Sequence, residues 1–422
     1  MYDNTVTEEI LNQGNTSYVP MKSTEPPNVT ERFENFVIST DRVYDMIGKR
    51  RAGEVSFEQS EQGDARRQLL HVEKVAIENK RLQKTSETSY IESVSYQLHD
   101  IIVEEMSEYL KDVPDVMANV LNLPSNTGEL LDALIVRACS VSKLEPIVAT
   151  IPWMYDELIS VVNTARFRRK DSRGRVIVVE TLRTALSFLG IENLRLLIPF
   201  LIVKRATPQI TDPYPLIKQK LASYSTGVAI SAQCIAEAAG THKGHGYMLG
   251  MLSNLGRCAV TRLYFRLFDK VQMHLLQECQ KDREHKRHDA LTKIIPSANH
   301  LIALQHAFAD TFNADLLDEL SLKRLFIAPA MRAVANQRSE TTSALSDTAT
   351  LSETQTPTDV LKSALSQARI YARIRLLHQN KLIEATAANS ELLAQRFPAG
   401  ALATLKNTDI FALPLVKSDI ED

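Results

Sequence analysis

The stretch Leu249-Gly-Met-Leu-Ser-Asn-Leu-Gly-Arg-Cys-Ala-Val260 decides our interpretation of the fold. Its apolar residues recur at helical spacing, which predicts one amphipathic helix. The apolar side of this helix comprises Met248, Leu252, Leu255 and Ala259. Gly250 and Gly256 lie inside the predicted helix, where each glycine costs about 1 kcal/mol relative to alanine. Such glycines usually permit a neighbouring helix to approach closely, so the stretch predicts a packed helical core.

Similar helical patterns fill most of the chain from residue 120 to 336. One segment should begin near Asp212-Pro213 and end at Gly240, and Ser297 should cap another. The apolar side of the first segment comprises Ile217, Leu221, Val228 and Ile235. Only residues 175–179 look strand-like, and they are short and isolated. We therefore predict an all-α fold, a multi-helix bundle with flanking helical segments.

The sequence suggests five consecutive regions. Residues 1–65 are polar and predict loose or partly ordered chain, 66–119 predict a helical extension, and 120–337 form the bundle. Residues 338–357 are rich in Ser and Thr and predict a flexible linker. Residues 358–422 predict a C-terminal helical segment whose apolar side needs a partner surface. That surface belongs either to the bundle or to another protein.

Composition excludes several classes of protein. The chain has 422 residues, 44% of them hydrophobic and 24% charged, with a formal net charge of −2. This balance argues against wholesale nucleic-acid binding. The four cysteines form no CxxC pair, which predicts buried, reduced thiols. No signal peptide is visible and the longest apolar stretch is about half of a membrane span, so we expect a cytoplasmic protein with no membrane contact.

Several histidine motifs have the residue types of catalytic or metal-binding sites. His99-Asp100 and His288-Asp289 are adjacent His-Asp pairs, the first on a helix face that looks exposed and the second in a charged run. We interpret both as chance occurrences, because short motifs recur at random. His242 and His245 have the spacing of two metal ligands on one helical turn, but neighbouring glycines favour a surface loop.

The basic run from Arg166 to Arg175 has two interpretations. It either binds an anion or nucleic acid through phosphate contacts or forms a solvated connection between helices. We favour the solvated connection, because the surrounding region is not basic.

Three segments, taken together, resemble a known family. They are residues 151–166 (IPWMYDELISVVNTAR), 181–198 (TLRTALSFLGIENLRLLI) and 249–260 (LGMLSNLGRCAV). Their order and separation are similar to those of the HDOD domain, an output-domain relative of HD phosphohydrolases found in bacterial signalling proteins. Asn163 matches the family's L-x-N-S/T-A pattern, and Gly190 ends its A-x-x-x-L-G pattern. The resemblance covers residues 120 to 335 and implies a bundle of HD/HDOD type.

The resemblance also implies a metal site that this chain has lost. HD hydrolases use adjacent His and Asp to bind a metal that activates water. The two corresponding positions hold Ser253 and Asn254, which are poor ligands for a transition metal. An upstream ligand position aligns with Tyr224, and His300 falls near another. One histidine cannot hold a metal, so we expect no metal and no cofactor.

The remaining motif residues can be explained by structural roles. Asn163 lies among apolar helical residues, where its amide should bond backbone groups of a neighbouring helix or turn. Gly190 should end one helix and let the next begin at once. Arg257 keeps the positive charge of the family's Lys, and it lies four residues after Ser253. It either binds a small anion or forms a structural ion pair.

Three functions follow as alternatives. The first is a non-catalytic signalling protein that binds other signalling proteins through its helical surface. The second is a metal-dependent phosphohydrolase acting on a nucleotide such as a cyclic dinucleotide. The third is a nucleotide or anion sensor that binds without turnover, through Arg257 and the run from Arg166 to Arg175. We favour the first, because the frame of the site is retained and its ligands are replaced.

Overall fold

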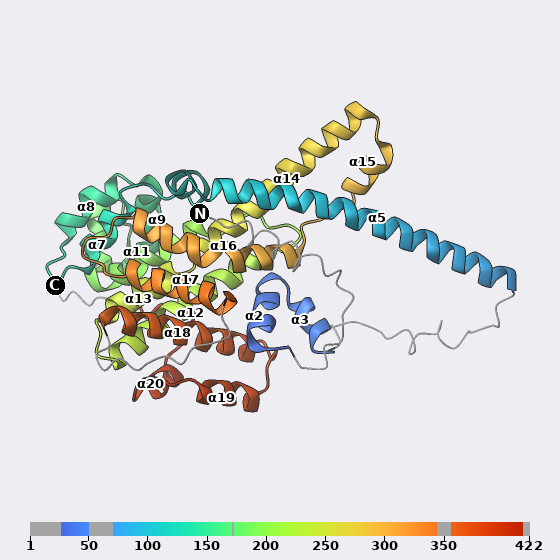
Figure 1. The fold of residues 1–422 in the computed structure, drawn as a ribbon. Coiled ribbons are helices and arrows are strands. Elements are labelled where there is room, and N and C mark those ends of the chain that lie inside the picture. The colour runs from blue at the N-terminus through green and yellow to red at the C-terminus, as the bar shows by residue number, and fades with distance from the viewer. Residues whose placement is uncertain (1–26, 50–70, 171–172, 344–355, 417–422) are drawn as a thin grey trace. The chain divides into compact units, whose positions relative to one another are not determined.

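The structure of this chain, a computed structural model, describes residues 27–49, 71–170, 173–343 and 356–416 (Figure 1). Helices make up nearly all of the regular structure in these ranges, which confirms the predicted all-α class. The chain divides into two compact units. The first comprises Met1–Glu108, Ile210–Pro215 and Leu263–Leu304, and the second comprises Tyr109–Gln209, Leu216–Arg262 and Gln305–Asp422.

The first unit begins with two short helices, α2 (Val29–Ile38) and α3 (Thr40–Met46). A capping box starts α2, in which the Asn28 side chain accepts from the Glu31 amide and the Glu31 carboxylate accepts from the Asn28 amide. Both helices bury apolar side chains, among them Phe33 and Phe36. Residues 29–46 are therefore an ordered part of the region predicted to be loose or partly ordered, and its segments 1–26 and 50–65 lie outside the described residues.

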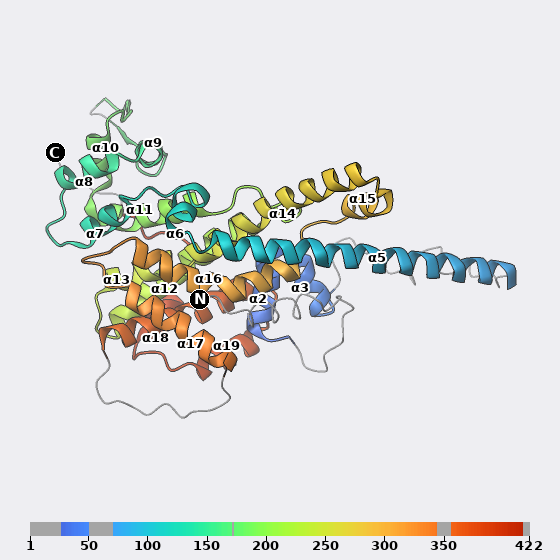
Figure 2. The same cartoon turned by 45° about the horizontal axis from the view of Figure 1, so that its top comes forward.

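The long helix α5 (His71–Tyr109) supplies most of the N-terminal extension. Helix α14 (Leu255–Asp282) belongs to this unit from Leu263 onward and is followed directly by α15 (His285–Leu291), which folds back beside it (Figure 2). The helix α16 (Ala298–Glu319) begins after Ser297, whose hydroxyl accepts from the His300 amide at 3.5 Å. Ser297 is therefore the helix cap that the sequence predicted.

The second unit holds the start of α14 up to Arg262, the part of α16 from Gln305 onward, and the remaining elements. Its helices before residue 210 are α6 (Val113–Asp115), the π-helix η2 (Val116–Val120), α7 (Thr127–Ile135), α8 (Val141–Ala149), α9 (Pro152–Val162), α10 (Leu182–Leu189) and α11 (Ile191–Ala206). The others are α12 (Ile217–Ala238), α13 (Lys243–Leu252), α17 (Ala328–Ser343), α18 (Pro357–Gln379), α19 (Ala385–Ala394) and α20 (Ala401–Asn407). Within this unit α12 packs against both α13 and α18 (Figure 1).

Two glycines explain how closely the helices of the second unit approach. A Cβ added at Gly250 of α13 would lie 2.7 Å from the Cα of Ala229 in α12, and one at Gly256 would lie 2.0 Å from the carbonyl oxygen of Ala309. Neither position has room for a side chain. The predicted role of both glycines in close helix packing is confirmed.

The strand-like segment is paired rather than isolated. Strand β2 (Val176–Ile177) pairs in antiparallel fashion with β1 (Arg169–Lys170). Asn163 ends α9 and fixes the far side of this hairpin: its Oδ1 accepts from the Val179 amide at 2.9 Å, and its Nδ2 donates to the Val179 carbonyl at 2.9 Å. The predicted structural role of Asn163 is confirmed, although the residue is half-buried.

Several predicted boundaries hold and others shift. Gly190 joins α10 to α11 with φ of +75°, a conformation that favours glycine. Helix α12 starts at Ile217 rather than at Asp212-Pro213, and residues 213–216 before it form turns. Residues 338–343 continue α17, so the linker prediction is wrong there, while 344–355 lie outside the described residues. The C-terminal segment packs on the bundle through α18, which answers the question of its partner surface.

The length and apolar character of the helices bear on whether the chain could span a membrane. Over the described ranges no single helix is long and apolar enough to cross a bilayer. The pair α10 and α11 passes that test jointly, but it bends by 111° and most of its apolar side chains are buried.

Candidate functional site

The turn between α13 and α14 contains Ser253 and Asn254, two of the predicted degenerate ligand positions. The Ser253 hydroxyl donates to the Gly250 carbonyl at 2.8 Å, and this local bond competes with continuation of the helix. Helix α13 therefore ends at Leu252 and α14 begins at Leu255. The prediction of one continuous helix is wrong, and Ser253 and Arg257 are not one turn apart on a single helix.

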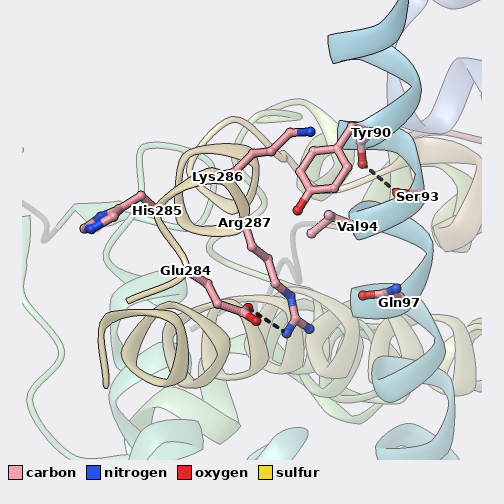
Figure 3. A pocket seen from close by; sticks show the side chains of 8 residues that line it. All are labelled: Tyr90, Ser93, Val94, Gln97, Glu284, His285, Lys286 and Arg287. Atoms are coloured by element: carbon pink, nitrogen blue, oxygen red, sulfur yellow. Dashed lines mark hydrogen bonds and ion pairs between the residues drawn. The ribbon is translucent and has the colours of Figure 1, made fainter. Parts of the chain in front are cut away.

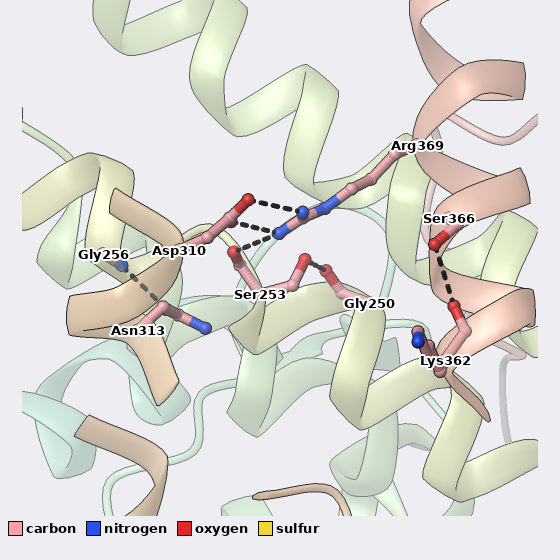
Figure 4. Close-up of polar contacts among 8 residues, drawn as sticks. All are labelled: Gly250, Ser253, Gly256, Asp310, Asn313, Lys362, Ser366 and Arg369. Carbon is pink, nitrogen blue, oxygen red and sulfur yellow. Dashed lines mark hydrogen bonds and ion pairs between the residues drawn. The ribbon is translucent and has the colours of Figure 1, made fainter. Parts of the chain in front are cut away.

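The helix break exposes a carbonyl that needs a donor. Carbonyls at a helix C-terminus lack intrahelical partners, and the helix dipole favours a positive charge beside them. Arg369 of α18 supplies both, because its Nη2 donates to the Ser253 carbonyl at 3.1 Å (Figure 4). The same guanidinium forms a bidentate pair with Asp310 of α16, with distances of 2.8 and 3.1 Å. Three helices thus converge on one cation.

The Arg369–Asp310 pair is held away from solvent. The two side chains are only 12% and 10% exposed. Burial opposes the charge on Arg369, but Asp310 more than offsets it, so the pKa of Arg369 lies above its ordinary value. Tyr224 of α12 acts in the same direction and Arg257 of α14 in the opposite one. The structure therefore gathers Tyr224, Ser253 and Arg257 around Arg369.

Asn254 contributes a neutral amide beside this pair. It is buried, and its Nδ2 makes no hydrogen bond to any residue that the structure describes. Asn313 of α16 behaves similarly: its Oδ1 accepts from the Gly256 amide at 2.8 Å, while its Nδ2 has no hydrogen-bond partner within the described ranges. These amides add donors rather than the anionic ligands that a divalent metal prefers.

The donor set around Arg369 does not fit a catalytic metal. Its one carboxylate, Asp310, is already engaged by the guanidinium. A divalent ion at the same place would meet a buried positive charge. More widely, the described residues contain no group of three or more His, Cys, Asp or Glu side chains that could hold a metal ion.

His300 lies in the other unit, where it forms a histidine pair. It is buried, and its ring stacks on that of His99 at a centroid distance of 3.9 Å. His300 is therefore a core histidine in the first turn of α16. The prediction of an exposed His99 is wrong: only 1% of this residue is exposed, and its Nε2 lies 3.1 Å from the Tyr264 hydroxyl.

Burial keeps both imidazoles of this pair neutral. It lowers the pKa of His99 to about 4, opposed by the hydrogen bond to the Ser95 carbonyl. Burial also lowers the pKa of His300 to about 3, with His99 adding to the effect. The pair is therefore a feature of the core of its unit rather than part of the Arg369 site.

The other histidine motifs have structural roles. His242 is the N-cap of α13, and its Nδ1 accepts from the Gly244 amide at 3.2 Å. His245 lies in the first turn of the same helix, so the surface-loop prediction is wrong for it. His288 and Asp289 form a contact of 3.8 Å on α15.

The candidate anion-binding residues are used within the protein. Arg257 is buried, with 7% exposure. Arg166 donates to the Leu413 and Leu415 carbonyls, and Arg168 donates to the Asn163 carbonyl. The guanidinium of Arg169 lies 4.4 Å from the ring centroid of Phe188. The described arginines of the run, apart from the half-buried Arg169, are exposed, in line with the favoured solvated connection, and Arg166 and Arg168 also hold backbone carbonyls.

One open cavity of about 500 Å³ lies in the first unit between α5 and α15 (Figure 3). Its lining comprises Tyr90, Ser93, Val94, Gln97, Glu284, His285, Lys286 and Arg287. Its two cations have internal partners: Lys286 lies 4.3 Å from the Tyr90 ring centroid, and Arg287 pairs with Glu284 at 3.4 Å. No sequence prediction falls on it, and its groups do not converge on a common point in the way that a catalytic site requires.

Sequence reasoning missed Arg369 and Asp310. A signal for Arg369 was present, because it lies four residues after Leu365 and three before Ala372, on the predicted apolar face of its helix. A charged residue at such a position needs a buried partner. Nothing in the local pattern singled out Asp310.

Residues 120–301 match the family model described as the HDOD domain. No curated protein and no solved structure shows significant similarity to the chain. The matched range contains Asn163, Gly190 and the turn at Ser253, and it ends before α17 and α18. Residues 120–301 of this chain therefore form an HDOD domain, an HD-related output domain made of helices.

Proposed function

We propose that this protein is a non-catalytic, cytoplasmic signalling protein that acts through contacts of its HDOD domain with other proteins. The observation that carries the proposal is the Arg369 guanidinium, which lies against Ser253 and Asp310. At this place an HD-type hydrolase would need a metal ion held by imidazole and carboxylate ligands. The Arg369 side chain takes the space that such an ion would need, and its positive charge already compensates the carboxylate of Asp310.

The origin of Arg369 adds a second argument. The residue comes from α18, outside the matched range 120–301, so this chain closes the site with a segment of its own. There the Arg369 guanidinium donates to the Ser253 carbonyl at the C-terminus of α13 and pairs with the Asp310 carboxylate. Such an arrangement stabilises the fold and offers no open coordination position for a water or substrate. What remains for function is the surface of the domain.

Metal content and turnover of the full chain test the non-catalytic part. The protein is purified without chelators, its Fe, Mn and Zn content is measured by mass spectrometry, and hydrolysis of bis(p-nitrophenyl) phosphate and cyclic dinucleotides is assayed with each metal added. We expect less than one-tenth of a metal per chain and no hydrolysis above the blank. About one metal per chain, with turnover that Asp310→Asn abolishes, would overturn the proposal.

Two further measurements separate the alternatives. The Arg369→Met variant removes the cation from the site. Arg332→Met is its matched control, because Arg332 pairs with Asp315 and Asp318 at a more exposed position. We expect neither variant to gain metal or activity. Calorimetry with the same nucleotides should show no binding, and binding without turnover would favour the sensor instead. Direct binding of a purified signalling protein recovered by affinity capture is the expected positive result.

A further inference from the structure

The hairpin of β1 and β2 exposes an apolar strand. Val176, Ile177 and Val178 follow one another along it and are 44%, 38% and 65% exposed. Contiguous exposed apolar side chains mark interaction sites on proteins. Arg169 lies opposite Ile177 on one face of the hairpin, and its guanidinium lies against the Phe188 ring of α10. Val176 and Val178 therefore lie on the other face, since side chains alternate along a strand.

The backbone of this strand has one edge without a neighbour. In antiparallel pairing, the N–H and C=O groups of alternate residues point to opposite edges. Val179 points inward, because its N–H and C=O both bond to the Asn163 side chain. Ile177, two residues earlier, points the same way toward β1, so Val176 and Val178 point outward. Neither the N–H nor the C=O of Val178 has a hydrogen-bond partner among the residues that the structure describes.

Positive charge surrounds the exposed strand. In the described ranges 163–170 and 173–180, five arginines stand against a single acidic residue, Glu180. Four of these arginines are exposed: Arg166, Arg168, Arg173 and Arg175. Arg166 and Arg168 donate to backbone carbonyls, which are uncharged, so these bonds leave both positive charges in place. The surface thus combines apolar side chains, free backbone groups and positive charge.

This combination favours an acidic extended chain over other occupants. A second copy of the same edge would place arginines against arginines, which repel one another. Nucleic acid and an anionic lipid surface match the charge, but neither offers alternating N–H and C=O groups at the spacing of a strand. An added strand bonds to the N–H and C=O of Val178, and its apolar side chains cover Val176 and Val178. Acidic residues at its ends complement the arginines.

We propose that the outer edge of β2, with Val176, Val178 and the flanking arginines, binds an extended acidic segment of another protein by strand addition. The segment carries β-branched residues at alternate positions and Asp or Glu at both ends. It forms a third strand beside β2. The proposal names a partner class for the signalling role proposed above and rests on that role only for its biological meaning.

A fluorescein-labelled peptide with the sequence DEVTVTVED tests this edge by anisotropy in titrations of the full chain. We expect saturable binding that Val178→Pro weakens by about tenfold or more, because proline has no N–H to donate. Val178→Thr is the matched control, since it keeps the N–H and the β-branched shape, and it should leave the affinity nearly unchanged. The Val179 amide should keep its slow hydrogen exchange in both variants, which shows that the hairpin is retained. No binding, or equal binding to Val178→Pro and the unaltered chain, would overturn the proposal.

Changes in the peptide make the test independent of the stability of the variants. One form is N-methylated at its three valines and another at its two threonines, so the lost donors of the two forms point to opposite edges. Only one form should lose affinity by about tenfold or more, since an added strand turns one edge to β2. Equal affinities of the two forms would contradict strand addition.

Charge and the competing classes of partner are tested in the same assay. The neutral peptide NQVTVTVQN should bind several times more weakly than the acidic one, and equal binding would refute the role of the arginines. Tighter binding of phosphatidylserine vesicles or of a DNA duplex, unaffected by Val178→Pro, would assign the surface to a membrane or to nucleic acid and overturn the proposal. Neither metal nor turnover is measured, so a failed titration leaves the non-catalytic proposal standing.

Discussion

Removing the charge of Arg369 should destabilise the protein strongly, because its partner Asp310 would stay buried. The Arg369→Met substitution keeps most of the side-chain volume but leaves a carboxylate that is 10% exposed and has lost a bidentate partner. Breaking one side of a buried ion pair costs about 3–5 kcal/mol. The Ser253 carbonyl would also lose its donor, for about 1 kcal/mol more. We therefore expect the free energy of unfolding to fall by about 4–6 kcal/mol, the sum of these two costs.

A double-mutant cycle separates the ion pair from simple packing. In Arg369→Met with Asp310→Leu, no unpaired charge remains, so most of the loss should be regained. Arg332→Met is the control at a partly exposed pair and should cost at most about 1 kcal/mol.

The assay is urea unfolding of the full chain, followed by circular dichroism at pH 7.5. A loss below about 1 kcal/mol for Arg369→Met would refute the reasoning, since that is the magnitude expected of a surface pair. A double variant as unstable as the sum of the two single variants would refute it as well. Either result would mean that the buried cation does not hold the site together.

The remaining predictions concern the histidine pair, the helix packing and the Asn163 clamp. The pKa of His99 is lowered to about 4 in the folded state, against about 6.5 when unfolded, so the folded state binds fewer protons and stability is lost as the pH falls through this range. Urea unfolding should show a loss of roughly 2 kcal/mol between pH 7.5 and pH 5 from His99 alone, and His99→Gln should flatten this dependence, whereas an unchanged slope would contradict the assignment. Gly250→Ala should lower the melting temperature by several degrees or prevent folding, because its Cβ would lie 2.7 Å from the Cα of Ala229, and a melting temperature equal to that of the unaltered chain would contradict the packing. Asn163→Ala should cost about 1–3 kcal/mol and speed the hydrogen exchange of the Val179 amide, while unchanged exchange would show that the clamp is dispensable.

The sequence alone predicted the helices and their apolar faces well. The periodic side chains of α12 and α18 are buried as expected, since a 3.6-residue repeat is a local property that any buried helix must satisfy. Gly190 and Asn163 were also predictable, because a positive φ and a capping amide are needed by the residues beside them. The local pattern also led to one wrong prediction, that of a continuous helix through Ser253. The Ser253 hydroxyl ends α13 in the middle of an unbroken apolar pattern.

His99 and Arg369 mark the limit of such reasoning. His99 follows Leu98 on α5, and no local rule says that Tyr264 and His300 will cover it. Arg369 reaches Asp310 across 59 residues and Ser253 across 116. The sequence by itself determined the helical class and the position of the HDOD segment. Only the tertiary structure decided that a guanidinium stands beside Ser253 and Asp310, because contacts between distant side chains depend on how whole helices pack.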